Sequence, residues 1–396
     1  MIKIDNIPVW GDPLDNAVDQ MKVCAKDAAY CALMADHHLG YSQPIGGVVA
    51  YRDKISPSGV GFDIACGNKA VRLDIRGMDV ILSGRVEGIM DRIFHGISFG
   101  IGRKNKKVVD DELFGDTAWS ILDPLFPDLK DKARSQLGTV GSGNHYVDLF
   151  VDEDDWVWVG VHFGSRGLGH TIASHFLKAA GGKDGIDAEP ALLDVNSVLG
   201  MQYLACMNLA GRYAYAGRNW VCQKVAGIIG ANIVEEVHNH HNFAWRENHF
   251  GEDLWVVRKG ATPAFPGQLG FVGGSMAEGS VILKGIDGQD SKDAMYSTVH
   301  GAGRIMSRTQ AAGKRRFKKG KQVKITEGEI SQAMMMEKVH NAGVTLRGAG
   351  VDESPHCYKR LPEVLMAHAN TIKIVHDLTP FGVAMAGANE YDPYKD

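Results

Sequence analysis

The chain has 396 residues, of which 44% are hydrophobic, and a formal net charge of −4 at pH 7. This composition is typical of a globular protein and excludes a strongly basic protein that coats nucleic acid, so any site for a polyanion must be local. The sequence has no signal-peptide core near its start and no run of about 18 apolar residues that could span a membrane. We therefore expect a cytoplasmic protein with no membrane span, whose six cysteines are reduced.

The first expected element is a helix that reaches Leu33. Asp12 and Pro13 are typical of a helix start, and apolar residues then recur at helical spacing. A polar cluster follows this helix and contains Asp36 and His38. Its spacing leaves two interpretations open: metal ligands or their supporting residues, or a capping aspartate and an exposed histidine.

Residues 59–67 form the first candidate functional segment, between strands expected at 48–52 and 69–75. Their sequence, Gly-Val-Gly-Phe-Asp-Ile-Ala-Cys-Gly, places a carboxylate, Asp63, and a thiol, Cys66, three residues apart. The glycines let the backbone approach a ligand closely, and an oxygen donor beside a sulfur donor suits zinc or manganese. On this segment alone, a strand end with a buried cysteine and a turn aspartate is the favoured interpretation; the histidines farther along the chain reverse that preference.

Two histidines lie beside glycine-rich loops in the next part of the chain. Residues 78–135 are expected to be largely helical, and the glycine-rich segment 137–145 then ends at His145. A strand expected at 155–164 places His162 near its end, again beside a glycine-rich loop. One histidine at a strand end is usually structural, but two beside such loops favour metal ligands.

A long helix is expected from about residue 199 to residue 236, with a break near Gly217. The segment 237–242 follows it and has three histidines in four residues, among them His241. This is the densest group of candidate ligands in the chain, and we interpret it as a metal-binding segment rather than a surface tract.

A phosphate-binding loop is expected at His300. A strand at 254–259 and a glycine-rich segment at 273–277 precede the sequence His-Gly-Ala-Gly-Arg, which ends at Arg304. Backbone N–H groups and guanidinium groups both suit phosphoryl oxygens. A glycine loop alone is a weak signal for this function.

The last part of the chain carries a basic run and two expected helices. Residues 314–321 include six basic side chains. A solvated loop is the simpler interpretation, but in an acidic chain we favour contact with a polyanion. The candidate RNA contacts in this run are Lys314, Arg315, Arg316 and Lys318. Helices are expected at about 326–341 and 361–377, with Pro380 ending the second one.

Candidate ligands recur from residue 36 to residue 304, so a division of the chain into separate domains would split the site. We therefore predict the α+β class, with mixed sheets around a central groove for metal and nucleotide. The prediction is one large domain over residues 1–396, with a C-terminal tail from about residue 388.

The candidate metal ligands are Asp63, Cys66, His145, His162 and His241. Five mixed donors exceed the needs of one tetrahedral ion, so we expect two metal ions that share the thiolate. Arg166 and Arg304 supply countercharge as candidate phosphate contacts, near the glycine-framed His300. Metals, arginines and such a histidine together indicate phosphoryl or nucleotidyl transfer, in which positioning and charge neutralisation do most of the catalysis.

Five motifs carry a resemblance to a known family. They are GVGFDIACG, GSGNHY, VHFGSRGLG, NHHN and HGAGRIMSR, in this order and at long, unequal spacings. With them the chain resembles the RtcB family of RNA ligases, from about residue 34 to the end of the last expected helix. Five motifs in the right order are a highly specific signal.

The resemblance implies a GTP- and manganese-dependent ligase that joins an RNA 3′-phosphate or 2′,3′-cyclic phosphate to a 5′-hydroxyl, in tRNA splicing or RNA repair. His300 is then guanylylated, GMP passes to the RNA 3′-phosphate, and the 5′-hydroxyl displaces it. The five candidate ligands become ligands of manganese. Asp148 matches a position that reads the guanine edge. The other nucleotide contacts are Asn144, Ser275, Gly301, Ala302, Gly303, Arg304 and Lys359.

Two departures from the family pattern place the chain in a divergent subgroup. Family members commonly end in Val-Lys-Gly, whose lysine contacts the guanylate; here residues 383–387 are Val-Ala-Met-Ala-Gly, and Lys359 is the nearest upstream candidate. A serine often follows the second histidine ligand, where this chain has Phe163. A manganese phosphoesterase acting on RNA ends and a non-catalytic RNA-end binder remain alternative functions, and the need for an archease-like activator stays open.

Overall fold

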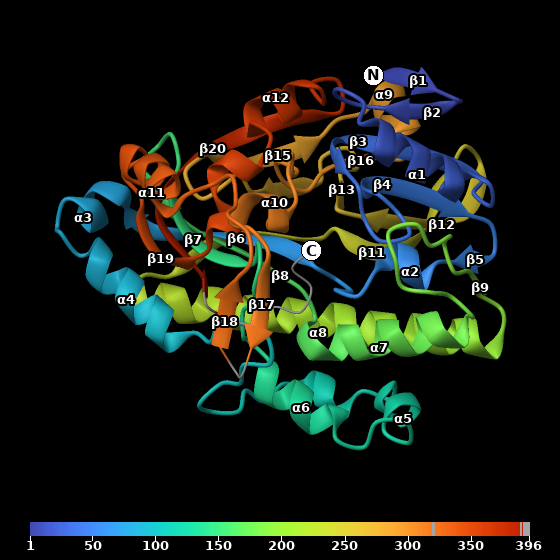
Figure 1. Ribbon diagram of the computed structural model, residues 1–396, viewed down its shortest axis with the longest axis horizontal. Coiled ribbons are helices and arrows are strands. Elements are labelled where there is room, and N and C mark those ends of the chain that lie inside the picture. Colours follow the sequence, from blue (N-terminus) through green and yellow to red (C-terminus); the bar gives the residue numbers. More distant parts are fainter. Residues whose placement is uncertain (319–320, 389, 391–396) are drawn as a thin grey trace.

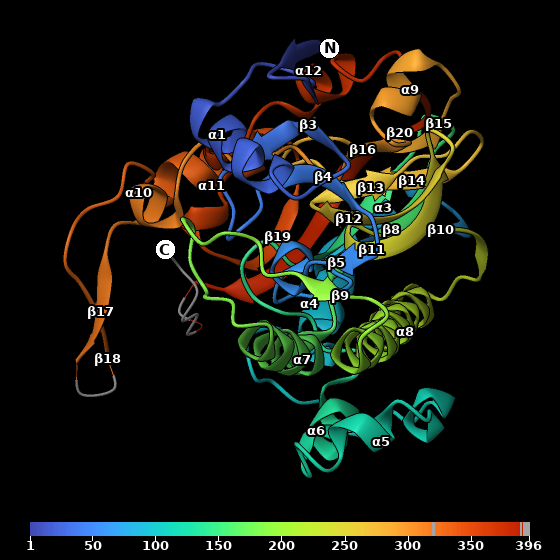
Figure 2. The ribbon, with the colours of Figure 1, turned by 90° about the vertical axis from the view of Figure 1, so that its right-hand side faces the viewer.

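The computed structural model describes residues 1–318, 321–388 and 390, and the side chains of these residues except 315–318 and 321–324. Helices and mostly antiparallel sheets alternate along the chain, and the predicted α+β class is confirmed. Two large sheets form the body, and the helices α7 (Arg166–Ala179) and α8 (Val198–Ile229) run side by side along it (Figures 1 and 2).

The six-stranded sheet is built around two strands whose residues are almost all buried, β3 (Tyr30–His38) and β4 (Ile45–Tyr51). The helix α1 (Asp15–Ala25) packs against both of them. The order of the sheet is β1 (Ile2–Ile4), β2 (Ile7–Val9), β3, β4, β12 (Glu252–Lys259) and β11 (Asn242–His249). The strands expected at 48–52 and 254–259 are thereby confirmed.

The expectation of one helix that reaches Leu33 is wrong. The helix α1 is followed by β3, so the apolar run at 31–35 lies in a strand. Both faces of this strand are buried, and a short apolar run without alternation cannot be assigned to a helix or a strand by periodicity alone. The N-cap position of α1 is occupied by Leu14, which makes no side-chain capping hydrogen bond, rather than by Asp12.

The eight-stranded sheet carries most of the candidate ligands at its strand ends. Its order is β10 (Ile233–His240), β6 (Gly67–Arg76), β8 (Trp156–Phe163), β7 (Tyr146–Val151), β20 (Ile372–Gly387), β15 (Ser280–Gly285) and β14 (Leu269–Val272). Neighbours in this order are antiparallel, and β19 (Thr345–Ala349) is added in parallel to β20. The strands expected at 69–75 and 155–164 are confirmed.

The helix α8 is continuous over 32 residues and packs along β6, β8 and β10. The expected break near Gly217 is wrong, because this glycine lies within the helix at a close approach to the Phe163 ring. The helix also ends earlier than expected, at Ile229. Gly230 terminates it in the left-handed conformation, with φ of 86°.

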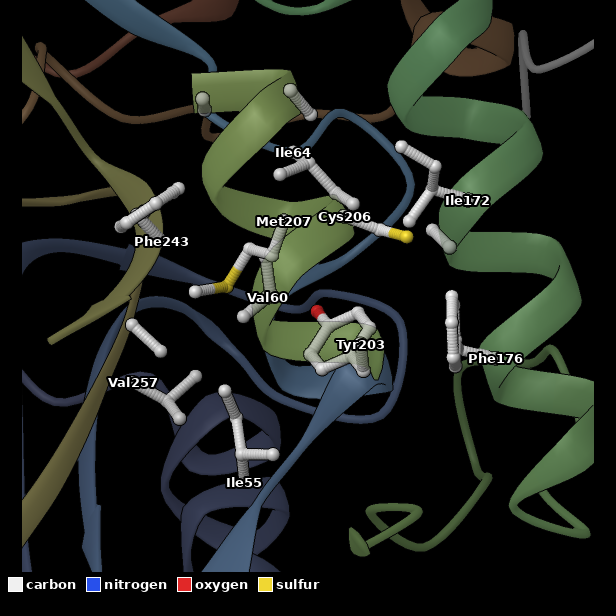
Figure 3. Close-up of a cluster of buried hydrophobic side chains, with 14 of the residues drawn as sticks. Ile55, Val60, Ile64, Ile172, Phe176, Tyr203, Cys206, Met207, Phe243 and Val257 are labelled. Carbon is white, nitrogen blue, oxygen red and sulfur yellow. The ribbon is translucent and has the colours of Figure 1, made fainter. Parts of the chain in front are cut away.

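The largest hydrophobic core lies between α7, α8 and the six-stranded sheet. Figure 3 shows Tyr203 and Met207 projecting from α8, between Phe176 of α7 on one side and Val257 of β12 on the other. Each such side chain stabilises the fold by about 1.5–3 kcal/mol when it is fully buried. The core therefore fixes α8 between α7 and the six-stranded sheet.

The C-terminal region differs from the expectation of two long helices. The first is α11 (Gln332–Asn341), but the second is only α12 (Leu361–Met366), and β20 follows it. Pro380 lies inside β20, at a register shift against β7, where a residue without an N–H is tolerated. Buried and exposed side chains alternate over residues 372–378, and this alternation was the missed signal for a strand.

The basic run forms a hairpin that projects from the body, with β17 (Arg315–Lys318) paired to β18 (Lys321–Lys324) (Figure 2). Lys314 is exposed at its base, whereas the side chains of Arg315, Arg316 and Lys318 lie outside the described residues. The remaining elements are α2 (Pro57–Val60), α3 (Gly77–Ile81), α4 (Val86–Gly96), α5 (Trp119–Leu122), α6 (Leu129–Gln136), α9 (Gln289–Asp293), α10 (Arg308–Ala312), η1 (Glu112–Gly115), η2 (Val351–Glu353), η3 (Pro355–Cys357), β5 (Lys54–Ile55), β9 (Leu193–Asp194), β13 (Ala261–Pro263) and β16 (Ser297–Val299). Over the described part of the chain, no helix combines the length and the apolar character needed to cross a membrane.

Candidate active site with a metal centre

A cavity of about 300 Å³ lies beside the ends of β6, β7, β8 and β10. Most of the predicted site residues line it, although they come from distant parts of the sequence. They are Asp63, Cys66, Asn144, His145, Asp148, His162, His241, Ser275, His300, Gly301, Ala302, Gly303 and Arg304. The fold therefore brings the candidate metal ligands, the candidate nucleotide contacts and the candidate nucleophile to one place.

Cys66 lies at the centre of the donor cluster. Its Sγ is 3.5 Å from Nε2 of His145 and 3.5 Å from Nε2 of His162, and the three ligand atoms lie within 4.8 Å of one another. Oδ2 of Asp63 is 3.1 Å from the same His145 nitrogen. The His241 ring stacks on His162, with 5.0 Å between the ring centroids. Sulfur, nitrogen and oxygen donors this close together fit a divalent transition metal such as zinc or manganese.

Pairing of three neighbouring strands explains why these donors converge. Gly67 opens β6 and is paired with Phe163 on β8 and with His240 on β10. A candidate ligand is the direct sequence neighbour of each residue in this row: Cys66, His162 and His241. Successive side chains of a strand point to opposite faces, so residues one step from a common row reach a common side of the sheet.

Burial and close neighbours set the protonation of the cluster. Burial raises the pKa of the Cys66 thiol well above its usual value, and it lowers the pKa of His162 and His241 well below theirs. For Asp63, burial opposes ionisation, but the hydrogen bond and charge of His145 outweigh it and hold the pKa at about 2. The site therefore offers a carboxylate and neutral imidazoles, and a metal would bind the thiol by displacing its proton.

Asn68 of β6 orients one of the donors. Its Oδ1 accepts a hydrogen bond from Nδ1 of His162 at 2.5 Å, while its Nδ2 donates to the backbone carbonyls of Phe271 at 2.9 Å and His300 at 3.1 Å. The two carbonyls fix the amide orientation, so His162 carries its proton on Nδ1 and presents Nε2 to Cys66. Asn68 was not predicted, although a polar residue in an apolar strand beside a ligand motif was a usable signal.

Asp36 of β3 holds His300 in the cavity. Its Oδ2 accepts hydrogen bonds from the His300 backbone N–H at 3.0 Å and from Nδ1 at 2.6 Å, so the ring proton resides on Nδ1 and Nε2 keeps its lone pair. Burial opposes ionisation of Asp36, but His300 outweighs it, and the pKa of this carboxyl lies below its usual range. His38 lines the same cavity, and burial lowers its pKa to about 4. Asp36 and His38 therefore do not fit the interpretation of a capping aspartate and an exposed histidine.

The loop after His300 is packed tightly and carries paired arginines. Gly303 has a φ of +78°, and a Cβ there would lie 2.2 Å from the Asp36 carbonyl oxygen, so only glycine fits. Arg304 donates to Oε2 of Glu353 at 3.3 Å. The cavity lining also includes side chains that were not predicted, among them Tyr146, Arg308, Glu353 and Tyr358. Glu353, which ends η2, thus neutralises part of the positive charge that Arg304 supplies.

Arg166 and Lys359, predicted as phosphate and nucleotide contacts, lie outside the cavity lining, as does Lys314 of the basic run. Arg166 begins α7, and its guanidinium donates to the Gly100 carbonyl at 3.3 Å. The Lys359 ammonium donates to the backbone carbonyls of Ala35 at 2.9 Å and His37 at 3.0 Å. Lys359 therefore holds β3 on either side of Asp36 rather than lining the nucleotide cavity.

Comparison with known proteins gives one consistent result. A family model described as tRNA-splicing ligase RtcB matches residues 18–123 and 123–386. A tRNA-splicing ligase RtcB of Archaeoglobus fulgidus is 32% identical, with 89% of this chain and 86% of the relative covered. A tRNA-splicing ligase RtcB of Thermococcus kodakarensis is 30% identical, with 90% of this chain and 87% of the relative covered. An RNA-splicing ligase RtcB of Escherichia coli is 29% identical, with 88% of this chain and 88% of the relative covered. The similarity therefore extends over nearly the whole chain and includes every segment of the cavity.

Proposed function

The chain belongs to the RtcB family of RNA ligases, and from this premise we propose that it is a GTP- and manganese-dependent ligase. It joins an RNA 3′-phosphate or 2′,3′-cyclic phosphate end to a 5′-hydroxyl end through a guanylate carried by His300. The relatives are named RNA-splicing and tRNA-splicing ligases, and we extend this role, together with RNA repair in the cytoplasm, to this chain.

The observation that carries the proposal is the hydrogen bond of 2.6 Å between His300 Nδ1 and Asp36 Oδ2, inside the cavity that also holds the metal donors. It leaves the Nε2 lone pair to attack the α-phosphorus of GTP, and the bond to pyrophosphate breaks as the N–P bond forms. Nδ1 keeps its proton, so the ring becomes cationic. The Asp36 carboxylate stabilises that charge as it develops.

The later steps return the histidine to its neutral form. An oxygen of the RNA 3′-phosphate attacks the guanylate phosphorus, and the bond from phosphorus to His300 breaks. The 5′-hydroxyl oxygen then attacks the activated 3′-phosphate, its proton passes to solvent, and GMP leaves as the phosphodiester forms. A 2′,3′-cyclic phosphate end is first opened by water to a 3′-phosphate.

Two manganese ions fit the donor set in this proposal. The residues that would hold them are Asp63, Cys66, His145, His162 and His241. When bound, the metal would neutralise charge on the phosphates and on the pyrophosphate leaving group. The Cys66 sulfur lies 3.5 Å from an imidazole nitrogen on each of two histidines, so its thiolate would be a ligand together with both. Because five donors exceed the needs of one tetrahedral ion, we propose that two ions would share it.

The remaining lining residues are assigned to the nucleotide, with Asp148 at the guanine edge. The other nucleotide contacts are Asn144, Ser275, Gly301, Ala302, Gly303 and Arg304. Lys359 acts by holding β3, and with it Asp36, beside His300. Arg166 and the basic hairpin are assigned to the RNA backbone. Because the cavity draws on segments from β3 to η2, we also propose that the chain folds as one domain.

Incubation with manganese and α-labelled GTP tests the proposal. The wild-type protein should form an acid-labile labelled adduct, whereas His300→Ala should form none and should retain the wild-type metal content. An adduct that survives in the variant shows that another residue is the nucleophile. Removal of RNA 3′-phosphates without GTP and without an adduct identifies a phosphoesterase instead, and binding of RNA ends with neither activity identifies a non-catalytic binder.

A further inference from the structure

A single arginine of α8, Arg218, contacts the backbone of the metal centre from the helix side of the sheet. Its side chain is 0% exposed. Nη1 donates to the carbonyls of Ala65 at 3.0 Å and Phe163 at 2.6 Å. Nη2 lies 3.0 Å from Nδ1 of His240, and Nε donates to Nε2 of His238 at 2.8 Å. One guanidinium thus joins β8, β10 and the segment that leads into β6.

Three of the four described hydrogen-bond partners of Arg218 are direct sequence neighbours of candidate metal ligands. Ala65 precedes Cys66, Phe163 follows His162, and His240 precedes His241. Two of these partners, Phe163 and His240, belong to the row that crosses β10, β6 and β8 at Gly67. Neighbouring side chains of a strand point to opposite faces of the sheet. Hydrogen bonds from Arg218 that hold this row on the α8 side therefore determine where the candidate metal donors reach the cavity.

One of the Arg218 hydrogen bonds holds Ala65 in an otherwise unfavourable backbone conformation. Its φ is +60°, in the left-handed region that residues with a Cβ adopt only when their surroundings hold them there. Its N–H donates to the carbonyl of Asn242 at 2.7 Å, and its carbonyl accepts from Arg218. The conformation of Ala65, which directly precedes Cys66, is therefore held by a hydrogen bond on each side of its Cα.

Gly67 leaves the space that Arg218 needs. A Cβ at this position would lie 2.2 Å from the Asn239 carbonyl oxygen and 3.1 Å from Nη1 of Arg218. Any side chain there would separate β6 from β10 and displace the guanidinium. The glycine that follows Cys66 in the motif thus has a packing reason: it lets β6 lie close to the backbone of β10 and leaves room for the guanidinium.

Arg218 is also an unusual buried cation, because each of the hydrogen-bond partners described for it is a neutral carbonyl or imidazole. Burial lowers its pKa to about 10, so it stays charged at neutral pH. A buried charge without a hydrogen-bonded carboxylate is costly. An apolar side chain would fill this space equally well, so packing does not explain the buried charge. The charge therefore points to a role of Arg218 in the site.

We propose that Arg218 is a positioning residue of the metal centre, whose guanidinium fixes the segments that carry Cys66, His162 and His241 in one arrangement. This inference deepens the proposed function and rests on its metal-dependent part. The bridging geometry requires a planar group with several donors, which an ammonium does not supply.

Metal binding by matched variants tests the inference. Arg218→Lys keeps the charge but cannot bridge the same partners, so we expect its affinity for Mn²⁺ and Co²⁺ to fall about tenfold to hundredfold, as for other residues that orient metal ligands. The thiolate-to-cobalt absorption band should shift or weaken. Arg258→Lys is the control, because Arg258 is also 0% exposed but its guanidinium donates to Glu247, Ser297 and the Met295 carbonyl, none of which is a sequence neighbour of a candidate metal ligand. The control should keep wild-type metal affinity even where urea unfolding shows a loss of stability.

The outcomes separate this inference from the proposed function. Unchanged affinity and an unchanged cobalt spectrum in Arg218→Lys overturn it, as does an equal loss of affinity in both arginine variants. If Arg218→Lys does not fold, His240→Leu removes one acceptor while it retains Arg218, and it should weaken metal binding in the same way; wild-type affinity there overturns the inference. Wild-type protein that binds metal but forms no guanylate contradicts the proposed function alone, and wild-type protein that binds no metal contradicts both.

Discussion

At the scale of single residues, burial decides the chemistry of Asp148. Its carboxyl lines the cavity, is 6% exposed, and has an Oδ1 with no hydrogen-bond partner among the described residues. Burial raises its pKa well above the usual value, and the backbone N–H of Ala384 opposes this only in part. The carboxyl therefore favours its protonated form until a ligand supplies donors to the anion.

We expect Asp148→Ala to remove most of the preference for GTP over ATP. The carboxylate can accept from both N1–H and the amino group of guanine, whereas N1 of adenine is an acceptor and would leave a buried polar group unpaired. Such a group costs about 1–3 kcal/mol, so the wild-type preference should be about tenfold to hundredfold. Adduct yields with GTP and ATP, measured side by side, test this, with Asp148→Glu as the control that keeps the carboxylate. An unchanged GTP-to-ATP ratio in Asp148→Ala would place guanine recognition elsewhere.

The raised pKa of Asp148 also predicts how GTP binding depends on pH. In the proposed assignment guanine contacts the anion, so binding should release the proton that the free carboxyl holds. GTP affinity should therefore rise as pH increases toward the pKa of the free carboxyl and should level off above it. Calorimetric titrations of wild type and Asp148→Ala over the same pH series isolate this contribution, because metal binding affects both proteins. Parallel pH profiles for the two proteins would contradict the assignment.

At the scale of elements, the start of α8 depends on a local capping interaction. Ser197 accepts a hydrogen bond from the Gly200 N–H at 3.0 Å, which satisfies one of the free amides of the first turn. Ser197→Ala should lower the free energy of unfolding by about 1 kcal/mol, while Ser197→Asp, an equally good cap, should not. Urea unfolding measures the difference. Both variants should keep wild-type metal binding, and equal stability of the two would show that the cap contributes nothing.

The basic hairpin is the element for which we predict a role in RNA binding. Neutral substitutions at Lys314, Arg315, Arg316 and Lys318 should weaken RNA binding and flatten its salt dependence, because each phosphate of a single strand that is neutralised adds about 0.7 to the slope. Guanylylation should be unaffected, because the hairpin projects away from the body (Figure 2). Fluorescence anisotropy across a salt series measures the slope. Lys178→Gln, at the C-terminal end of α7, is the control, because it also replaces a positive charge with a neutral side chain. An equal slope of RNA affinity against salt concentration in both variants would show that the hairpin is a solvated loop without a role in RNA binding.

At the scale of the whole molecule, the metal donors connect segments that are far apart in the sequence. Four of the candidate donors, Cys66, His145, His162 and His241, lie at the ends of β6, β7, β8 and β10, so bound metal would cross-link four adjacent strands of the eight-stranded sheet. A ligand that binds only the folded state stabilises it by about 2.7 kcal/mol at a hundred times its dissociation constant. The metal should therefore act as part of the fold and not only as a catalyst.

We accordingly expect chelation to lower the unfolding temperature of the wild-type protein. Cys66→Ser should bind at least one metal fewer per chain and should lose most of the stabilisation that added Mn²⁺ gives. Burial raises the pKa of the Cys66 thiol, so binding must displace its proton, and metal affinity should fall as pH falls. Thermal unfolding with and without Mn²⁺, together with metal analysis, measures these effects. A full complement of two metals in Cys66→Ser would contradict the shared-thiolate prediction.

The sequence by itself determined the features that depend on local chemistry. Strands at 48–52, 69–75, 155–164 and 254–259 were predicted and are present, because alternation or an apolar run between turn signals is a local property. The donor candidates were identified in the same way, since thiol, imidazole and carboxylate groups beside glycine-rich loops are recognisable without knowledge of their neighbours. The motifs also indicated the family that the comparisons show.

Only the tertiary structure decided how these local features are joined. Asp36 and His300 form their hydrogen bond across 264 positions, and Arg218 reaches three segments at once, so no spacing in the chain predicts either arrangement. The same holds for the apolar run at 31–35, where burial on both faces selected a strand over the expected helix. Gly217 remained helical because the packing of α8 against Phe163 outweighs the low helix propensity of glycine. In each case the deciding energy comes from contacts between segments that meet only in the folded chain.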